Sequence, residues 1–118
     1  MLKIETYFPS TILTNADLAA TQPDYNMDRL SKKIGIEQRY VCSPNETALD
    51  LAIKACEKLL VNEDKSSIDF LIYCTQSPEY FLPTTACILQ HKIGLKTSCG
   101  ALDYNLGCSG YVYGLALA

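Results

Sequence analysis

Cys108 is the residue of this sequence best placed for chemistry. It lies between an apolar run that ends at Leu106 and another that begins at Tyr111, a pattern that predicts a strand-to-helix turn. Gly107 and Gly110 flank it and permit a tight turn with close packing of helix on strand. A helix N-terminus favours the thiolate, the nucleophilic form of cysteine, and directs N–H groups at a developing oxyanion. We therefore expect an acyl-transfer nucleophile, although a core cysteine in an ordinary turn fits the same pattern.

The elements that would position this turn alternate from residue 45 onward. Residues 43–46 (SPNE) match a capping box with proline at the first helical position, and an apolar stripe of helical period follows to Leu60. The run 68–74 is nearly all apolar, as in a strand covered on both faces. The pattern then predicts a helix over 83–93 that starts on Pro83, a strand over 101–106 and a last helix from Tyr111. This order indicates an α/β fold, a mostly parallel sheet with helices on its faces, whose reactive groups collect at the carboxyl ends of the strands.

The first 41 residues predict shorter elements, read from caps and breakers. These are a strand over Leu2–Phe8, a helix capped by Thr14 and ended by Pro23, a helix capped by Asn26 that closes at Gly35, and an edge strand or hairpin arm over Ile36–Val41.

Length and composition limit the class of protein. The 118 residues, 48% hydrophobic and 19% charged, suffice for one globular domain with a core. A net charge of −3 disfavours nucleic acid as a partner, because phosphate binding needs a basic surface. Without a long apolar run or a signal peptide, we expect no membrane contact and a cytoplasmic location. The uncapped apolar ending YVYGLALA suggests that 1–118 is a domain cut within the helix that follows the nucleophile.

The other cysteines and the lone histidine have simpler interpretations. The six cysteines are spaced too widely for a C-x-x-C pair, so neither a zinc site nor any other metal site is expected. His91 lies near a predicted helix C-terminus, where it would face the dipole or solvent rather than catalyse. Free thiols in apolar runs behave as small hydrophobes. Burial is therefore expected for Cys56, Cys74 and Cys87, with Cys42 and Cys99 left open.

Residues 103–116 (DYNLGCSGYVYGLA) resemble the active-site stretch of the β-ketoacyl-acyl-carrier-protein synthase III family. Further segments resemble the same family in the same order, at 13–18, 34–39, 45–52, 68–75 and 82–87. The resemblance implies most of the N-terminal half of a thiolase-like fold, in a protein that works as a homodimer. It also implies transfer of an acyl group from acyl-CoA to Cys108, then decarboxylative condensation with malonyl-acyl carrier protein. The histidine and asparagine of the second step belong to the family's second half and are absent from this chain.

The same resemblance suggests substrate-binding residues. Family members often carry a tryptophan that stacks on the adenine of CoA; this chain has none, and Arg29 stands at that position. Lys33 matches the basic residue expected before Gly35, and Leu82 the residue that reaches the partner's acyl pocket and limits its length. The acyl thioester of CoA is a substrate here, and no resident cofactor is implied. Arg29 also fits a solvated helix charge, and Leu82 a loop residue held before a proline.

Two other functions compete with the condensing enzyme. A condensing-enzyme-like partner without catalysis could serve dimerisation or chain-length control, but such proteins typically lose the nucleophile, and Cys108 is retained. A redox thiol protein is disfavoured, because no resolving cysteine lies nearby in the sequence.

Overall fold

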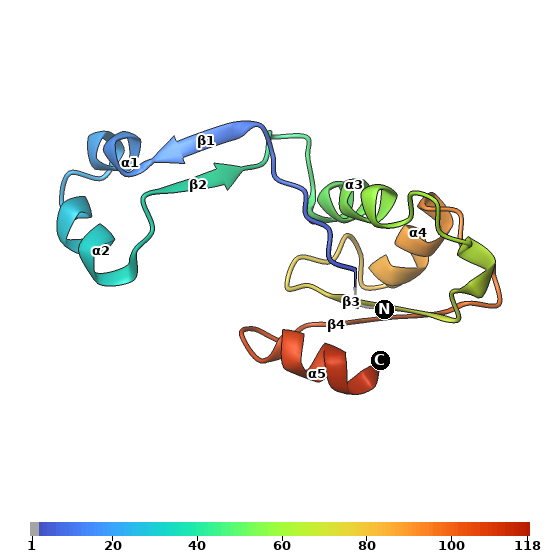
Figure 1. Cartoon of the computed structure of the whole chain (residues 1–118). Coiled ribbons are helices and arrows are strands. Elements are labelled where there is room, and N and C mark those ends of the chain that lie inside the picture. The colour runs from blue at the N-terminus through green and yellow to red at the C-terminus, as the bar shows by residue number, and fades with distance from the viewer. Residues whose placement is uncertain (1–2) are drawn as a thin grey trace. The chain divides into compact units, whose positions relative to one another are not determined.

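The computed structural model describes residues 3–118 (Figure 1). Its contacts separate two compact units, which we call the hairpin unit (residues 8–46) and the sheet unit (residues 3–7 and 47–118). Cys108 belongs to the sheet unit. Among the helices of residues 3–118, none combines the length and apolar character needed to span a bilayer.

The hairpin unit consists of β1 (Thr11–Thr14), α1 (Asn15–Thr21), α2 (Met27–Ile34) and β2 (Gln38–Val41). The two strands pair antiparallel, with Thr11 opposite Val41, which confirms the predicted hairpin arm. The Thr14 hydroxyl accepts the N–H of Asp17 at 3.2 Å, and the Asp17 carboxylate accepts the N–H of Thr14 at 2.8 Å. This reciprocal pair confirms the predicted start of α1.

Both predicted ends of the second helix are confirmed as well. The Asn26 side chain accepts the N–H of Arg29 at 2.8 Å and caps the start of α2. Gly35 ends the helix with a left-handed φ of 71°, a conformation that a residue with a Cβ adopts only at a cost.

The sheet unit contains a parallel strand pair between helices. Its elements are α3 (Ala48–Leu59), a short 3-10 turn η1 (Lys65–Ser67), β3 (Phe70–Cys74), α4 (Thr85–Lys92), β4 (Gly100–Tyr104) and α5 (Gly110–Leu117). β3 and β4 run parallel in register, from Phe70 opposite Gly100 to Cys74 opposite Tyr104. Figure 1 shows α3 and α4 on one face of this pair and α5 on the other. The predicted α/β class is confirmed.

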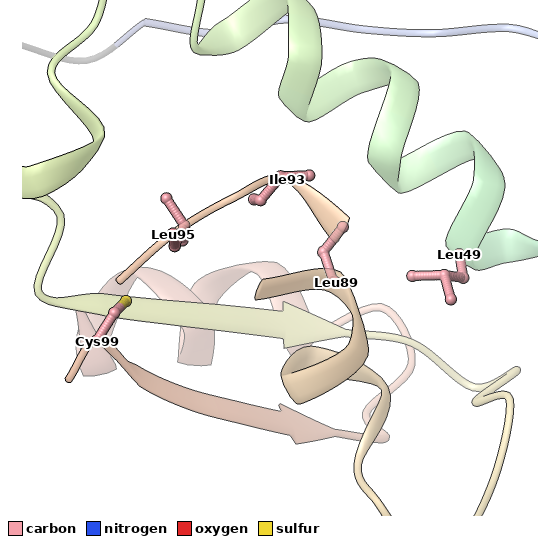
Figure 2. Close-up of a cluster of buried hydrophobic side chains, with 5 residues drawn as sticks. All are labelled: Leu49, Leu89, Ile93, Leu95 and Cys99. Carbon is pink, nitrogen blue, oxygen red and sulfur yellow. The ribbon is translucent and has the colours of Figure 1, made fainter. Parts of the chain in front are cut away.

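The core lies between α3, α4 and one face of the strand pair. Figure 2 shows its five buried side chains, Leu49, Leu89, Ile93, Leu95 and Cys99. Cys99, which the sequence left open, is therefore a core thiol. No residue of β3 is fully buried, and Phe70 and Cys74 at its two ends are exposed, so the prediction of a strand covered on both faces is wrong for the part of the chain that the structure describes.

The strand predicted over Leu2–Phe8 is wrong within the part that the structure describes; Leu2 lies outside the described residues. Residues 3–8 form no strand. Their alternation suits a strand, but lysine side chains hold them along α3 instead of a neighbouring strand. The bonds are Lys3 Nζ to Leu59 O at 2.8 Å, Lys58 Nζ to Thr6 O at 3.0 Å and Lys54 Nζ to Tyr7 Oη at 3.0 Å.

Two predicted helix starts are displaced. α3 is capped by Thr47 and not by Ser43, because Thr47 exchanges hydrogen bonds with Asp50 as a complete capping box. Ser43 instead closes a turn, its carbonyl accepting the N–H of Glu46 at 3.0 Å. Pro83 also lies outside its helix, since Thr84 occupies the N-cap position of α4.

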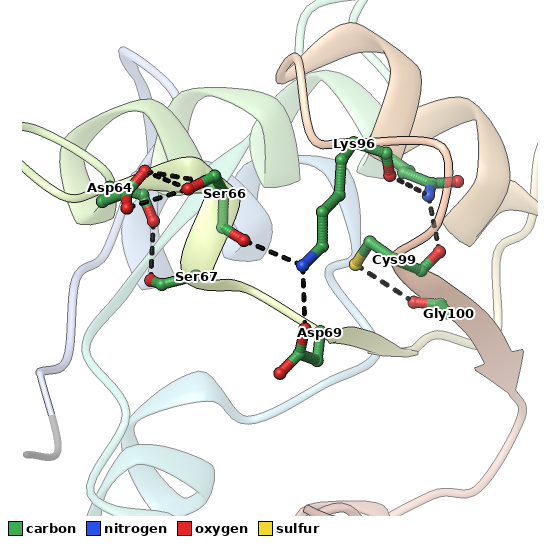
Figure 3. Close-up of polar contacts among 8 residues, drawn as sticks. Asp64, Ser66, Ser67, Asp69, Lys96, Cys99 and Gly100 are labelled. Carbon is green, nitrogen blue, oxygen red and sulfur yellow. Dashed lines mark hydrogen bonds and ion pairs between the residues drawn. The ribbon is translucent and has the colours of Figure 1, made fainter.

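A polar network holds the amino ends of β3 and β4, opposite the end that carries Cys108 (Figure 3). Lys96 Nζ donates to Ser66 O and to the Asp69 carboxylate, both at 2.8 Å. Gln90 Nε2 donates to the carbonyls of Lys96 and Cys99 at 2.9 and 2.7 Å. These bonds join η1, the end of α4 and both strands, so the register of the parallel pair is fixed away from the nucleophile.

Two substitutions test directly which residue caps α3. Thr47→Ala should lower the free energy of unfolding by about 1 kcal/mol, because the first turn of α3 loses the acceptor for an N–H group. Ser43→Ala, at the position that the sequence pattern favoured, should leave it nearly unchanged. Urea unfolding at neutral pH measures both, and a larger loss in Ser43→Ala would place the cap at Ser43.

The same cap should make stability fall in acid. The hydrogen bond from the Thr47 backbone, opposed by a smaller desolvation effect, lowers the pKa of Asp50 below its ordinary value. A carboxylate with a lowered folded-state pKa stabilises the fold above the pKa of the unfolded chain, and this is lost as pH falls through the folded value. Urea unfolding between neutral pH and pH of about 2 should therefore show a smaller acid-induced loss in Asp50→Asn than in the unaltered protein. Equal losses would contradict the prediction.

Candidate active site

Cys108 lies in a tight turn between β4 and α5. The N–H of Gly110 donates to Gly107 O at 2.9 Å and closes the turn, and the Cys108 side chain is exposed. β4 ends at Tyr104 and α5 begins at Gly110, so the thiol stands at the carboxyl end of a parallel strand as expected. Ser109 makes no side-chain cap of α5. The N–H groups that follow Gly110 in the first turn are therefore free of a capping side chain and suit a negative oxygen beside the thiol.

Close packing of α5 on the strand pair holds this turn in place. The Tyr104 hydroxyl donates to Gly110 O at 2.6 Å. A Cβ on Gly110 would come within 2.5 Å of Cys74 Sγ, and one on Gly114 within 2.7 Å of Tyr104 Oη. The expected role of Gly110 in helix-on-strand packing is confirmed. Gly107 differs, because a Cβ there would meet nothing within 4 Å.

Two of the three cysteines expected to be buried are exposed. Cys56 is half-buried, and desolvation by burial raises the pKa of its thiol. Cys74 is exposed because it faces the glycine side of α5, beside an open cavity of about 330 Å³. Its thiol lies 3.6 Å from Leu106 O. Cys87 is exposed in the first turn of α4, where the Thr84 hydroxyl donates to its sulfur at 3.2 Å.

A loop between β3 and α4 forms a second hollow at the same end of the sheet. An open pocket of about 240 Å³ is lined by Thr75, Pro78, Tyr80, Phe81, Thr84, Asp103, Tyr104 and Asn105. Leu82 lies in this loop and is 82% exposed. It does not line the pocket.

Arg29 and Lys33 lie together on α2, in the hairpin unit. Both line an open pocket of about 300 Å³ with Asp24, Tyr25, Asn26 and Leu30. Tyr25, 63% exposed, was missed by the sequence reasoning, although an aromatic residue just before a basic helix was a readable signal. The pocket thus combines two cations, one carboxylate and an aromatic ring, and the cations and the ring are of the types that bind the phosphate and the base of a nucleotide.

His91 is exposed in the last turn of α4, which confirms its expected surface position. Its expected lack of a catalytic role stays a prediction.

Curated relatives match nearly the whole chain. A β-ketoacyl-[acyl-carrier-protein] synthase III of Nitratidesulfovibrio vulgaris is 39% identical over 114 residues, which cover 95% of this chain and 34% of that protein. The synthase III 2 of Halalkalibacterium halodurans is 35% identical over 117 residues, covering 98% of this chain and 35% of that protein. No family model matches the chain.

Solved structures share the fold. A crystal structure of a 3-oxoacyl-(acyl-carrier-protein) synthase III superposes with a TM-score of 0.89 at 49% identity, covering 98% of this chain and 35% of that one. The synthase III from Thermus thermophilus gives a TM-score of 0.88 at 34% identity, covering 100% of this chain and 36% of that one. The chain spans about a third of the length of the relatives it matches. From these matches in sequence and fold, the chain belongs to the β-ketoacyl-[acyl-carrier-protein] synthase III family of thiolase-like proteins.

Proposed function

We propose that the protein carrying this chain is a 3-oxoacyl-[acyl-carrier-protein] synthase III that uses Cys108 as its acyl-accepting nucleophile. The observation that carries the proposal is the exposed thiol in a glycine-bounded turn, at the carboxyl end of β4 and just before α5. The relatives are named for this synthase activity, which supports the same reaction class here.

The first step is acyl transfer onto sulfur. The Cys108 thiolate attacks the thioester carbonyl of acyl-CoA, a new C–S bond forms, and the CoA thiolate leaves. The carbonyl oxygen becomes negative in between, and the uncapped N–H groups at the start of α5 are suited to stabilise it. Covalent catalysis of this kind divides a difficult carbon–carbon bond formation into two easier steps.

The second step is condensation. Malonyl-acyl carrier protein loses carbon dioxide, and the resulting carbanion attacks the acyl carbonyl, so that a C–C bond forms and Cys108 leaves as thiolate. The histidine and asparagine that the family resemblance assigns to this step are not in these 118 residues. The sheet unit thus supplies the nucleophile, and the condensation needs groups outside this chain.

The remaining parts of the proposal follow from the resemblance and the site. Leu82, an exposed apolar side chain, reaches the acyl pocket of the partner subunit and favours an acyl group of modest length. The partners are acyl-CoA, acyl carrier protein and a second copy of the protein in a cytoplasmic homodimer. No resident cofactor takes part, since the thioester itself is the activated substrate.

Incubation of the full-length protein with acetyl-CoA, followed by peptide mass spectrometry, tests the proposal. We expect one acetyl group on the peptide that contains Cys108. Lack of an adduct on this peptide would contradict the proposed enzymatic function and favour the alternative of a non-catalytic condensing-enzyme-like partner.

The pocket that Arg29, Lys33 and Tyr25 line beside α2 should bind the nucleotide of CoA. Arg29→Ala or Tyr25→Ala should raise KM for acyl-CoA about tenfold, because a cation or stacking surface for the phosphorylated adenosine is lost. KM for the matching acyl-pantetheine, which lacks the nucleotide, should not change. Lys32→Ala, on the same helix but outside the pocket, is the control. An unchanged KM for acyl-CoA in Arg29→Ala would make Arg29 a solvated surface charge.

A further inference from the structure

The N-terminus of α4 is capped by a side chain from β4. Its own N-cap residue, Thr84, makes no side-chain cap hydrogen bond. Instead, the carboxylate of Asp103 accepts the N–H of Thr85 at 3.1 Å and the N–H of Ala86 at 3.3 Å. Thr85 and Ala86 are both 0% exposed, so water does not compete at these two residues. A carboxylate at a helix N-terminus is doubly suited, as charged acceptor and as partner of the helix dipole.

Thr85, at the start of α4, also holds the loop that precedes this helix. The Thr85 hydroxyl accepts the N–H of Glu79 at 3.0 Å. The loop between Glu79 and Thr85 carries Leu82, which is 82% exposed. A chain of contacts therefore runs from the loop at Glu79 through Thr85 to the carboxylate on β4.

The next residue of β4 holds the nucleophile turn. Tyr104 donates to Gly110 O at 2.6 Å, at the first residue of α5. Successive side chains of a strand point to opposite faces, so Asp103 reaches α4 while Tyr104 reaches α5. The last two residues of β4 thus join the loop of Leu82 to the turn of Cys108 through one rigid strand.

We propose that Asp103 is a positioning residue that holds the loop at 79–84 in place and thereby sets the acyl-chain selectivity of the enzyme, because this loop presents Leu82 to the acyl pocket of the partner subunit. Both of its oxygens are engaged by the amides of α4, so it acts through the helix and the loop. The inference rests on the proposed function, in which Leu82 reaches the partner's acyl pocket and limits its length.

The test compares acyl donors on the full-length protein. The ratio of kcat/KM for octanoyl-CoA to that for acetyl-CoA should change about tenfold in Asp103→Asn. The amide oxygen of Asn accepts only one of the two N–H groups, and its NH2 group places a donor against the other. Thr85→Val keeps the side-chain volume and removes the acceptor for Glu79, so its ratio should move in the same direction. Asp69→Asn, whose carboxylate binds Lys96 at the other end of the sheet, should stay within about twofold of the unaltered ratio.

Alkylation of Cys108 by iodoacetamide should proceed at the unaltered rate in Asp103→Asn, because Tyr104 and not Asp103 holds the turn. Equal losses of kcat/KM for both donors, with an unchanged ratio, would show a merely structural role and overturn the inference. If Asp103→Asn does not fold, the ratio in Thr85→Val decides by the same criterion. Absence of any acyl adduct in the unaltered protein would refute the proposed function, whereas adducts with unchanged ratios in the variants would refute only the role of Asp103.

Discussion

Cys108→Ser is expected to abolish the acyl-enzyme and to lower kcat for condensation about 10³-fold or more, the scale seen when a covalent nucleophile is removed. A serine hydroxyl is scarcely ionised at neutral pH, whereas a cysteine thiol is far more readily converted to its nucleophilic anion. The N-terminus of α5 supports a thiolate but cannot make a hydroxyl into an alkoxide. Peptide mass spectrometry after acetyl-CoA, together with a condensation assay, measures both effects.

Cys87→Ala is the matched control. Cys87 is also an exposed thiol in the first turn of a helix, but it follows a loop and not the carboxyl end of a strand. Its removal should leave the acetyl adduct on Cys108 intact. An acetyl adduct on Cys87 in the Cys108→Ser variant, or loss of the adduct on Cys108 in the Cys87→Ala variant, would contradict the prediction. Either result would show that exposure at a helix start, and not the turn after β4, selects the nucleophile.

The features that could be predicted correctly from the sequence are those that depend on neighbours within a few residues. Asn26 caps its helix through an N–H three residues on, and Gly35 ends it through its own φ. The turn at Cys108 belongs to the same kind, because Gly107 and Gly110 close it by one local hydrogen bond. Local chemistry decides these positions, and the pattern of residue types carries that chemistry.

Where two local patterns compete, the sequence alone cannot choose. Ser43 and Thr47 each have an acidic residue three positions on, and the structure shows that α3 is capped at Thr47, two residues before the buried Leu49. The cap of α4 is harder still, since its acceptor, Asp103, lies 18 residues from Thr85 in the chain. Such a contact joins two elements that are distant in the chain, so it has no local signal.

The exposed cysteines follow from the same limit. Cys74 lies in an apolar run, and its residue type predicts burial. What covers it is the glycine side of α5, and a glycine hides less of a neighbour than a larger side chain does. Which face of a helix meets which strand is a tertiary property. It leaves the Cys74 side chain exposed and makes Gly110 necessary for the close approach of α5 to β3.

Gly110→Ala should displace the nucleophile turn. Its Cβ would stand 2.5 Å from Cys74 Sγ and 3.3 Å from Leu106 Cβ, and neither neighbour is the end of a long flexible chain. Overpacking of this kind costs about 1–3 kcal/mol of stability. The helix must move away from β3, and a shift of about 1 Å at a reacting atom can slow a reaction by about 10²-fold. The rate of Cys108 acetylation should therefore fall by at least about tenfold.

A second substitution separates this clash from other effects of alanine. Cys74→Ala removes the sulfur that the new Cβ would meet, so the double variant with Gly110→Ala should recover most of the lost acetylation rate. Gly107→Ala, three positions before the start of α5 and with nothing within 4 Å of its Cβ, should acetylate at nearly the unaltered rate. If Gly107→Ala were as slow as Gly110→Ala, the turn itself would need both glycines. If the double variant showed no recovery, contact with Cys74 would not be what holds α5 and its nucleophile in place.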